Sequence, residues 1–237
     1  AIYSLRAGAG EKLQPYVELA EFTINESLES ILEGIWKRQP KVIGFSCYIW
    51  NWKLIREILT ELPKILPDTE IWLGGPEVTY DGPGLLREFP QVTGIMVGEG
   101  EVTFREVLEQ YLREAETAGQ SEQQPESDST EQQVADRRGT VAGKSVAERF
   151  GQIPGLCLAS GYTAPRDLTD LTTLPFLYEN MEPFTNRIIY YETSRGCPYR
   201  CSYCLSSIDK KVRLRDISVV KRELQFFLDQ NVKQVKF

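Results

Sequence analysis

The most informative absence in this 237-residue sequence is histidine, which does not occur at all. Histidine is the usual general base near neutral pH and the commonest nitrogen ligand of protein-bound metals. Any mechanism written for this chain must therefore do without an imidazole, either as a base or as a metal ligand.

Long apolar runs and an excess of basic residues are also lacking. The longest apolar run, at about residues 42–52, is too short and too mixed to cross a bilayer, so no membrane anchor is expected. The net charge of −7 gives no clear footprint for nucleic acid. A local basic cluster is interpreted as a solvated face: Lys210, Lys211, Arg213 and Arg215.

Cysteine is scarce, and its distribution argues against a disulfide framework. The chain has five cysteines, an odd number, and three of them are crowded into one tract. No secretory segment precedes them, so we expect a reducing, cytoplasmic setting.

The three crowded cysteines are Cys197, Cys201 and Cys204, and they follow an apolar, strand-like run. We therefore expect them on a loop at the carboxyl end of a strand, where α/β proteins commonly place their chemistry. Gly196 and Pro198 favour the bends that let backbone and sulfurs converge.

Three thiols suit an iron–sulfur cluster better than zinc. A closed structural zinc site needs four Cys or His ligands, and the fourth ligand here would have to be the distant Cys47 or Cys157. A four-iron, four-sulfur cluster can be held by three thiolates, which are soft donors suited to iron, and one iron then stays open to a ligand that is not protein. Zinc, a redox thiol pair and unligated cysteines are the alternatives.

Strand-like and helix-like periodicity alternate along residues 1–112. Strands are predicted at 16–22, 41–46, 70–73 and 93–97. Helices are predicted at 1–7, at 28–36 after a cap at Asn25, at 54–62 before Pro63 or Pro67, near 85–86 and at 104–112. This alternation predicts an α/β fold with a parallel, doubly wound sheet of the Rossmann or flavodoxin-like kind.

Composition divides the chain into four segments. Residues 1–113 form the α/β domain, and residues 114–146, rich in Glu, Gln, Ser and Thr, are predicted to be a disordered polar linker or insertion. Residues 147–185 are predicted to be a hairpin and an extended connector. Residues 186–237 give strand, cysteine loop, helix, a cap at Asn231 and strand, which is the first βαβ unit of an incomplete barrel.

The cysteine spacing Cys197-x3-Cys201-x2-Cys204, with Tyr203 just before the last cysteine, resembles that of radical S-adenosylmethionine (radical SAM) enzymes. The resemblance implies that each cysteine binds one iron of a [4Fe-4S] cluster, while the open iron chelates SAM. It also implies reductive cleavage of SAM to a 5′-deoxyadenosyl radical, with Tyr203 beside the adenine. The final segment would then begin a radical SAM barrel, a partial TIM barrel, and a flavodoxin or ferredoxin would supply the electron.

The upstream α/β domain resembles the cobalamin (B12)-binding domain that precedes the barrel in many radical SAM enzymes. Glycines follow two predicted strands at Gly74-Gly75 and at residues 98–100, where open α/β sheets bind ligands, although such glycines often only turn the chain. The resemblance places the cobalamin nucleotide tail near Ser46, Gly74 and Gly75. The best-known cobalamin domains have a histidine as lower axial ligand in the loop after the first strand. This chain has none, and that loop would lie before residue 1.

Several other side chains are expected to serve only in packing or helix stability. Cys47 and Cys157 are predicted to be buried thiols. Glu99 and Glu101 suit the acidic first turn of a helix. No binding role is assigned to the tryptophans, which are expected in core or edge packing: Trp36, Trp50, Trp52 and Trp72.

These features predict a cobalamin-associated radical SAM enzyme that transfers a methyl group or modifies its substrate in another radical reaction. The substrate, a small molecule or a macromolecule, is not readable from the sequence. One alternative is a methylthiotransferase-like radical SAM enzyme without cobalamin, which shares the lead-in from Thr193 to Pro198 but carries a further cysteine set where this chain has only Cys47. Another alternative is a non-catalytic metal-binding or redox-sensing module.

The sequence also resembles a fragment truncated at both ends. In the flavodoxin-like order the first strand lies between the second and the third, so its loss would leave two interior edges without partners. We expect the 237-residue chain alone to be poorly stable and inactive.

Overall fold

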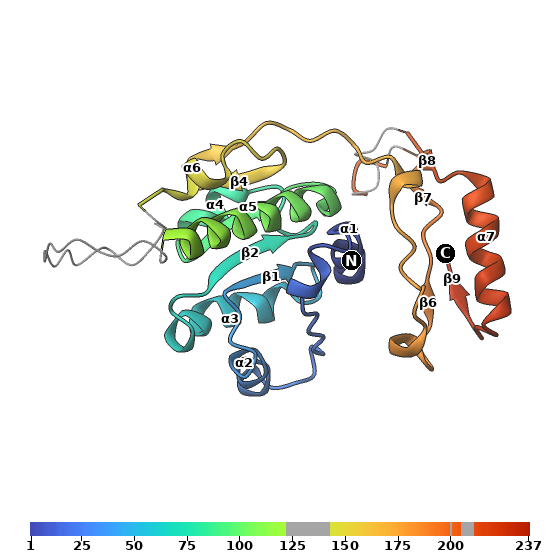
Figure 1. The fold of residues 1–237 in the computed structure, drawn as a ribbon, viewed down its shortest axis with the longest axis horizontal. Coiled ribbons are helices and arrows are strands. Elements are labelled where there is room, and N and C mark those ends of the chain that lie inside the picture. Colours follow the sequence, from blue (N-terminus) through green and yellow to red (C-terminus); the bar gives the residue numbers. More distant parts are fainter. Residues whose placement is uncertain (122–142, 200, 205–210) are drawn as a thin grey trace, which may run out of the picture. The chain divides into compact units, whose positions relative to one another are not determined.

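The computed structural model describes residues 1–121, 143–199, 201–204 and 211–237. It divides into two compact units, residues 1–167 and residues 168–237 (Figure 1). Most of the predicted linker, residues 122–142, and Lys210 of the basic cluster lie outside the described residues.

Unit 1 is built around a five-stranded sheet with the order β1-β2-β3-β4-β5 (Figure 1). The strands are β1 (Val42–Ser46), β2 (Glu70–Gly74), β3 (Val92–Met96), β4 (Leu156–Leu158) and β5 (Gly161–Tyr162). The first three pair in parallel, whereas β4 and β5 add an antiparallel hairpin to β3. The predicted α/β class with a parallel sheet is confirmed, and the hairpin expected after residue 147 belongs to this same sheet.

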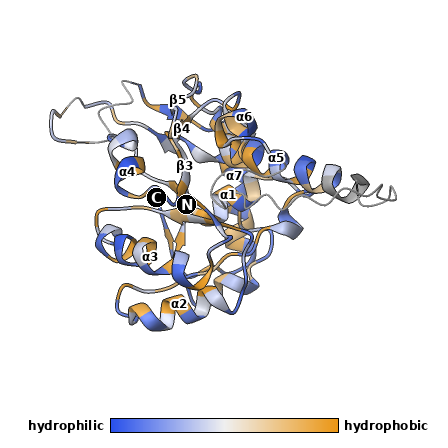
Figure 2. Ribbon diagram, turned by 90° about the vertical axis from the view of Figure 1, so that its left-hand side faces the viewer, coloured by the Kyte–Doolittle hydropathy of each residue, from blue (hydrophilic) through white to orange (hydrophobic). Residues whose placement is uncertain are grey.

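Alternation along β2 decides which helices cover each face of the sheet. Ile71 and Leu73 pack with α2, α3 and α4, while Trp72 between them packs with α5 and α6 on the other side. In Figure 2, α2 and α3 are striped blue and orange, as expected of helices with one apolar face. The helices are α1 (Ile2–Gly8), α2 (Leu28–Trp36), α3 (Trp52–Ile65), α4 (Gly82–Glu88), α5 (Gly100–Ser121) and α6 (Val146–Phe150).

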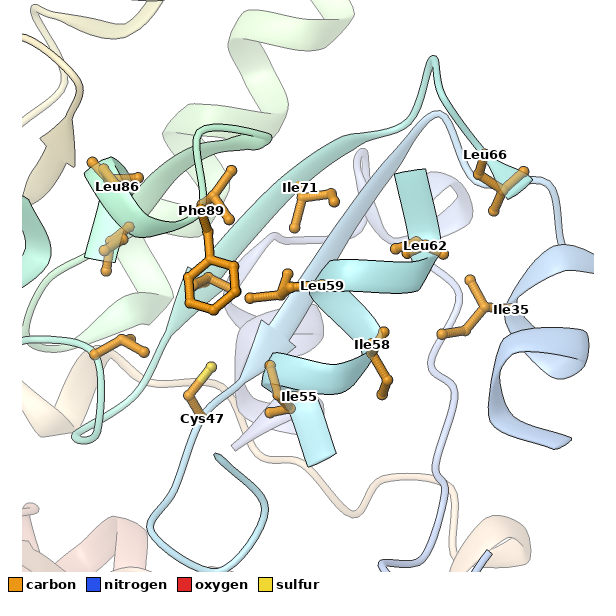
Figure 3. Packing of buried hydrophobic residues seen from close by; sticks show 14 of the residues in the cluster. Ile35, Cys47, Ile55, Ile58, Leu59, Leu62, Leu66, Ile71, Leu86 and Phe89 are labelled. Atoms are coloured by element: carbon orange, nitrogen blue, oxygen red, sulfur yellow. The ribbon is translucent and has the colours of Figure 1, made fainter. Parts of the chain in front are cut away.

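The larger apolar cluster fixes the helices onto the sheet. Figure 3 shows Leu59 of α3, Ile71 of β2 and Phe89 after α4 converging on one side of the sheet. Leu59 and Leu62 are fully buried, and burial of a side chain of this size contributes roughly 1.5–3 kcal/mol. This core holds β1 and β2 in register, and with them the loops at their carboxyl ends.

The strand predicted at residues 16–22 does not form. A short 3-10 helix, η1 (Gln14–Tyr16), is followed by irregular chain up to α2. Within the described residues β1 has β2 as its single strand neighbour, so the alternating segment does not pair with the open edge of β1. The sequence predicts two strand edges without partners. One of them is present, on β1, and the other is absent because the strand predicted at residues 16–22 does not form.

Two helix boundaries differ from the prediction. The α2 helix begins after Ser27, whose hydroxyl oxygen accepts a hydrogen bond from the Ser30 amide at 3.2 Å, so Asn25 is not the cap. The α3 helix runs through Pro63 and ends before Pro67, so only the second of the two predicted stops operates.

The first residues of the predicted linker are helical rather than disordered, because α5 continues to Ser121. The Arg149 side chain of α6 is only 1% exposed and forms ion pairs with Glu114 of α5 and Glu70 of β2, each at 2.9 Å. A buried ion-pair network therefore joins the chain that precedes residues 122–142 to the chain that follows them.

Unit 2 contains a parallel βαβ connection. The strand β6 (Ile189–Tyr190) pairs in parallel with β9 (Val235–Lys236), and α7 (Ile217–Asp229) lies between them in the chain. Between β6 and α7, β7 (Ser194–Arg195) pairs antiparallel with β8 (Arg213–Leu214). The expected order of strand, cysteine loop, helix and strand is confirmed, and Asn231 just past α7 has a left-handed φ of 53° that suits a helix end.

The rest of unit 2 is a connector over residues 168–188 with two short 3-10 helices, η2 (Leu171–Thr173) and η3 (Glu182–Phe184). Aromatic rings of this connector pack against α7: the Phe176 ring lies 5.4 Å from that of Phe227, centroid to centroid. Across all the residues that the structure describes, no helix combines the length and the apolar character needed to cross a bilayer.

Candidate functional site

The carboxyl ends of β1 and β2 bring together the residues predicted to lie near cobalamin. Ser46 is the register partner of Gly74, and Gly74 is in turn the partner of Met96 on β3. The Cys47 amide donates a hydrogen bond to the Gly74 carbonyl oxygen at 2.7 Å, which joins the two loops as the strands end. Ser46, Gly74 and Gly75 therefore share the sheet edge where open parallel sheets bind ligands, and their binding of cobalamin stays a prediction.

Glycine is required at position 75 by both conformation and space. Its φ is +105°, which side chains rarely adopt, and a Cβ added there would lie 2.5 Å from the Cys47 carbonyl oxygen. A Cβ added at Gly74 would meet Met96 Cβ at 3.7 Å, which is ordinary van der Waals contact. The sequence could identify the glycine pair, but only the structure separates the essential member from the tolerant one.

Asn51 holds the loop after β1 in a defined shape. Its side-chain oxygen accepts a hydrogen bond from the Tyr48 amide at 2.8 Å, and its side-chain nitrogen donates to the Ser46 carbonyl oxygen at 2.9 Å. An asparagine that bonds nearby backbone in this way fixes a turn. The loop therefore presents the intervening residues in a fixed arrangement.

Those intervening residues form an exposed apolar surface that sequence reasoning missed. The Tyr48 and Trp50 rings stack with centroids 4.4 Å apart, and Ile49 and Trp50 are 79% and 62% exposed. The expected core packing is confirmed for Trp72, which is buried, but Trp50 has most of its surface open to solvent. The signal in the sequence was position: aromatic residues come directly after a strand, at the edge where open parallel sheets commonly bind ligands.

The loop after β3 also reaches this edge and leads into α5. Gly98 has a φ of +82°, and α5 begins at Gly100. Glu101 in the first turn is buried and accepts a hydrogen bond from the Ser4 hydroxyl of α1 at 2.9 Å. This contact agrees with the structural role predicted for that carboxylate, because it ties α1 to α5.

The two isolated cysteines are packing residues, as predicted. Cys47 and Cys157 are fully buried in the larger apolar cluster, where Figure 3 shows Cys47 beside Ile55. Burial raises the pKa of the Cys47 thiol to about 12 and also raises the pKa of Cys157. Both thiols are therefore protonated at neutral pH, which does not suit a thiolate ligand or nucleophile.

Two hollows of unit 1 lie away from this edge. One, of about 320 Å³, is lined by residues 9–13 and α5, and another, of about 260 Å³, by α4 and the β4–β5 turn. Both are open to solvent. The carboxyl edge of the sheet is the better candidate, because it combines exposed backbone with exposed aromatic side chains.

The cysteine loop of unit 2 lies between β7 and β8. Cys197 and Cys201 are half-buried, Cys204 is exposed, and none of them forms a disulfide. The Cys204 amide donates to the Cys201 carbonyl oxygen at 3.1 Å, which forms a turn. Over the described part of the loop the structure does not gather three metal-binding donors at one point. The donor set fits an iron–sulfur cluster chemically, with three reduced thiols on one loop, but the structure does not pre-assemble it.

Tyr203, predicted to lie beside the SAM adenine, is 91% exposed. Its neighbour Tyr199 is exposed as well. Both rings are therefore accessible on the loop, and a contact with adenine stays a prediction.

Two members of the basic cluster are not simply solvated, contrary to the prediction. Arg213 is half-buried and donates to the Thr169 carbonyl oxygen at 2.7 Å. The side chain of Arg215 is buried and paired with the buried carboxylate of Glu223 on α7, with Nη1 and Oε2 2.9 Å apart. The Arg215 amide also donates to the Thr193 carbonyl oxygen at 2.9 Å, which closes the base of the cysteine loop.

Comparison with known proteins finds similarities that cover unit 1 and unit 2. The family model of the B12 binding domain matches residues 6–108, which include β1, β2, β3 and the edge described above. The resemblance to cobalamin-dependent radical SAM enzymes is confirmed.

Two relatives illustrate the similarity. The chain is 30% identical over 175 residues to the cobalamin-dependent radical SAM methyltransferase TokK of Streptomyces tokunonensis, covering 70% of this chain and 22% of TokK. It is 27% identical over 241 residues to a 2-(S-pantetheinyl)-carbapenam-3-carboxylate methyltransferase of Streptantibioticus cattleyicolor, covering 97% of this chain and 30% of that protein. The chain thus spans less than a third of either relative.

The fold has a counterpart among solved structures. The apo, selenomethionine-labelled form of OxsB, a cobalamin-dependent SAM radical enzyme, superposes with a TM-score of 0.62 over 96% of this chain and 29% of OxsB. At 18% sequence identity this similarity concerns the fold alone.

Proposed function

We propose that this chain is the cobalamin-binding and cluster-binding part of a radical SAM enzyme, most simply a methyltransferase. The observation that carries the proposal is the combination of a B12 binding domain match over residues 6–108 with three reduced thiols on one loop of unit 2. The relatives named as methyltransferases support the general kind of reaction. A flavodoxin or ferredoxin is the proposed electron donor, and the proposed setting is the cytoplasm.

Cobalamin would bind at the carboxyl edge of β1 and β2. Ser46 offers a hydroxyl there, and Gly75, which packs against the Cys47 backbone, holds the loops after β1 and β2 together beside it. The exposed Ile49 and Trp50 offer an apolar surface of the kind that a large ring such as corrin can cover. The exposed apolar side chains and the hydroxyl at this edge therefore fit a bulky ligand with both apolar and polar groups.

Cys197, Cys201 and Cys204 would hold a [4Fe-4S] cluster, with Tyr203 available to contact SAM. When bound, the cluster supplies the electron that cleaves SAM to a 5′-deoxyadenosyl radical, and cobalamin supplies a carrier for a methyl group. The chain's own part is to keep the three thiols on one short loop and to close the base of that loop through the bond between Arg215 and Thr193.

The test is simultaneous loading of both groups. The chain is reconstituted anaerobically with iron, sulfide and hydroxocobalamin, then desalted and assayed for bound cobalamin and iron. We expect about one cobalamin and about four irons per chain, with a reduced-cluster spectrum that changes when SAM is added.

The outcomes separate the alternatives. Iron without cobalamin would favour a methylthiotransferase-like enzyme, which the B12 binding domain match argues against. Tight zinc with no response to SAM would favour a non-catalytic metal or redox module. Either result would contradict the proposal.

A further inference from the structure

A buried carboxylate on α7 binds both ends of the cysteine loop. Glu223 is 4% exposed, and its Oε2 accepts a hydrogen bond from the hydroxyl of buried Tyr191. Arg215 donates to the same carboxylate twice, from Nη1 to Oε2 at 2.9 Å and from Nη2 to Oε1 at 3.0 Å. Tyr191 lies just before the loop, and Arg215 just after it. We call these three side chains the α7 clamp.

Backbone pairing continues from the clamp into the loop. Ser194 of β7 is the register partner of Leu214 of β8, and the Arg215 amide donates to the Thr193 carbonyl oxygen at 2.9 Å. The base of the loop is therefore a short two-stranded ladder whose two outer ends are bound to one carboxylate. The position of Glu223 on α7 therefore determines the position of both ends of the cysteine loop.

The return strand is anchored on a third segment as well. Arg215 Nη2 donates to the Leu174 carbonyl oxygen at 3.0 Å, and Arg213 Nη1 donates to the Thr169 carbonyl oxygen at 2.7 Å. Arg213 and Arg215 are two residues apart on an extended segment, so their side chains lie on the same side. The end of β8 is thus anchored on two elements, the connector and α7.

Stability alone is a weak reason for such a clamp. Replacing a buried ion pair by apolar residues of similar size is often neutral or stabilising, since removing charges from water is unfavourable. The loop itself carries exposed side chains, with Tyr199, Tyr203 and Cys204 all open to solvent. The described part of the loop therefore depends on its base for placement.

We propose that Glu223 is a positioning residue for the cysteine loop, which it holds by both ends through Tyr191 and Arg215 so that the three thiols can converge on a cluster and retain it. This inference rests on the proposed function. It adds a residue from α7, outside the cysteine motif, to the requirements for cluster retention.

The first measurement needs no metal. Hydrogen exchange of the metal-free chain is compared for wild type and Glu223→Gln, with circular dichroism as a check on folding. We expect the Arg215 amide and the peptides covering residues 193–204 to exchange about tenfold faster in the variant, as suits the loss of a hydrogen bond to a charged group. Unchanged exchange there would overturn the proposal, whatever the cluster does.

A double variant separates positioning from folding. Arg215→Met with Glu223→Met removes the clamp and leaves no buried charge unpaired. We expect it to keep a thermal midpoint near that of wild type while the loop still exchanges faster. A double variant with wild-type exchange would show that the clamp serves folding only, and would overturn the proposal.

The last measurement is iron loss from the reconstituted chain to a chelator. We expect Glu223→Gln to release iron about fivefold faster or more, a change of about 1 kcal/mol. Glu70→Gln is the matched control, because Glu70 is paired with a buried arginine in unit 1, and it should release iron at the wild-type rate. Equal rates for wild type and Glu223→Gln would contradict the proposal, whereas a wild-type chain that takes up no iron would contradict the proposed function instead.

Discussion

Gly75 and Cys47 approach each other so closely that a Cβ added at Gly75 would lie 2.5 Å from the Cys47 carbonyl oxygen. This contact joins the loops that follow β1 and β2. The geometry of the candidate cobalamin edge therefore depends on one glycine.

Gly75→Ala is expected to lower the free energy of unfolding by about 1–3 kcal/mol, because alanine is strained at a φ of +105° and its Cβ would contact Cys47. Denaturant unfolding of the cobalamin-free chain measures the change. Gly74→Ala is the matched control, since its Cβ would meet only ordinary contacts, and it should change stability by less than about 1 kcal/mol. Equal effects of the two substitutions would contradict this account of the edge.

Trp50→Ala is expected to weaken cobalamin binding by about fivefold or more with little loss of stability, because the ring is exposed and contributes little to the core. Binding is measured by titration with hydroxocobalamin. Trp36→Ala provides the comparison. Trp36 is exposed as well, at 51%, but it lies at the end of α2 and not in the loop after β1. If both variants bind cobalamin equally well, the aromatic surface after β1 is not part of the site.

Arg149→Met is expected to destabilise the chain by about 3 kcal/mol, because it leaves the carboxylates of Glu70 and Glu114 without their buried partner. Thermal or denaturant unfolding provides the measurement. Arg105→Met serves as the control, since the Arg105–Glu109 pair is exposed and long, at 3.9 Å, and its loss should change stability by less than about 0.5 kcal/mol.

The same network predicts a dependence on acid. Burial alone would raise the pKa of Glu114, but hydrogen bonds from Arg149 and Gln110 outweigh it and hold the pKa below its ordinary value of 4.5. A lowered folded-state pKa contributes stability above pH 4.5 that is lost as the pH falls through the folded value. We expect this acid-sensitive part to be smaller in Arg149→Met, and identical pH profiles for the two proteins would count against the network.

Thiol reactivity should divide the cysteines into two classes. Cys47 and Cys157 are buried and have raised pKa values, Cys47 to about 12, whereas the loop cysteines are half-buried or exposed. In the metal-free chain at pH 8 a disulfide reagent should label Cys197, Cys201 and Cys204 rapidly, and the other two only after unfolding. Mass spectrometry of the labelled peptides identifies the sites. Rapid labelling of Cys47 in the folded chain would contradict its place in the core.

The sequence predicts the central sheet well because each strand carries its own pattern. The continuous apolar run Ile71-Trp72-Leu73 is enough to define a strand with two buried faces, and Ser46 and Gly74 follow as the ends of their strands. Local pattern alone does not supply a pairing partner, which is why the alternating segment at 16–22 is irregular in the structure.

Long-range pairing and exposure are what the sequence could not give. Glu223 and Arg215 belong to different elements, so nothing in their local sequence shows that each neutralises the other inside the fold. Trp50 is a large, mainly apolar residue of the kind expected in a core, and only the turn fixed by Asn51 places it at the surface. The binding of iron by the three loop cysteines follows from their spacing and stays a prediction.

The most direct measurement is the iron content of the anaerobically reconstituted chain when Cys201 is replaced by alanine, with Cys47→Ala as the matched control. Cys201 lies on the loop, whereas Cys47 is a buried thiol in the core of unit 1. We expect about four irons per chain in wild type and in Cys47→Ala, and a loss of most of that iron in Cys201→Ala. Unchanged iron in Cys201→Ala, or no iron in wild type, would contradict cluster binding by the cysteine loop.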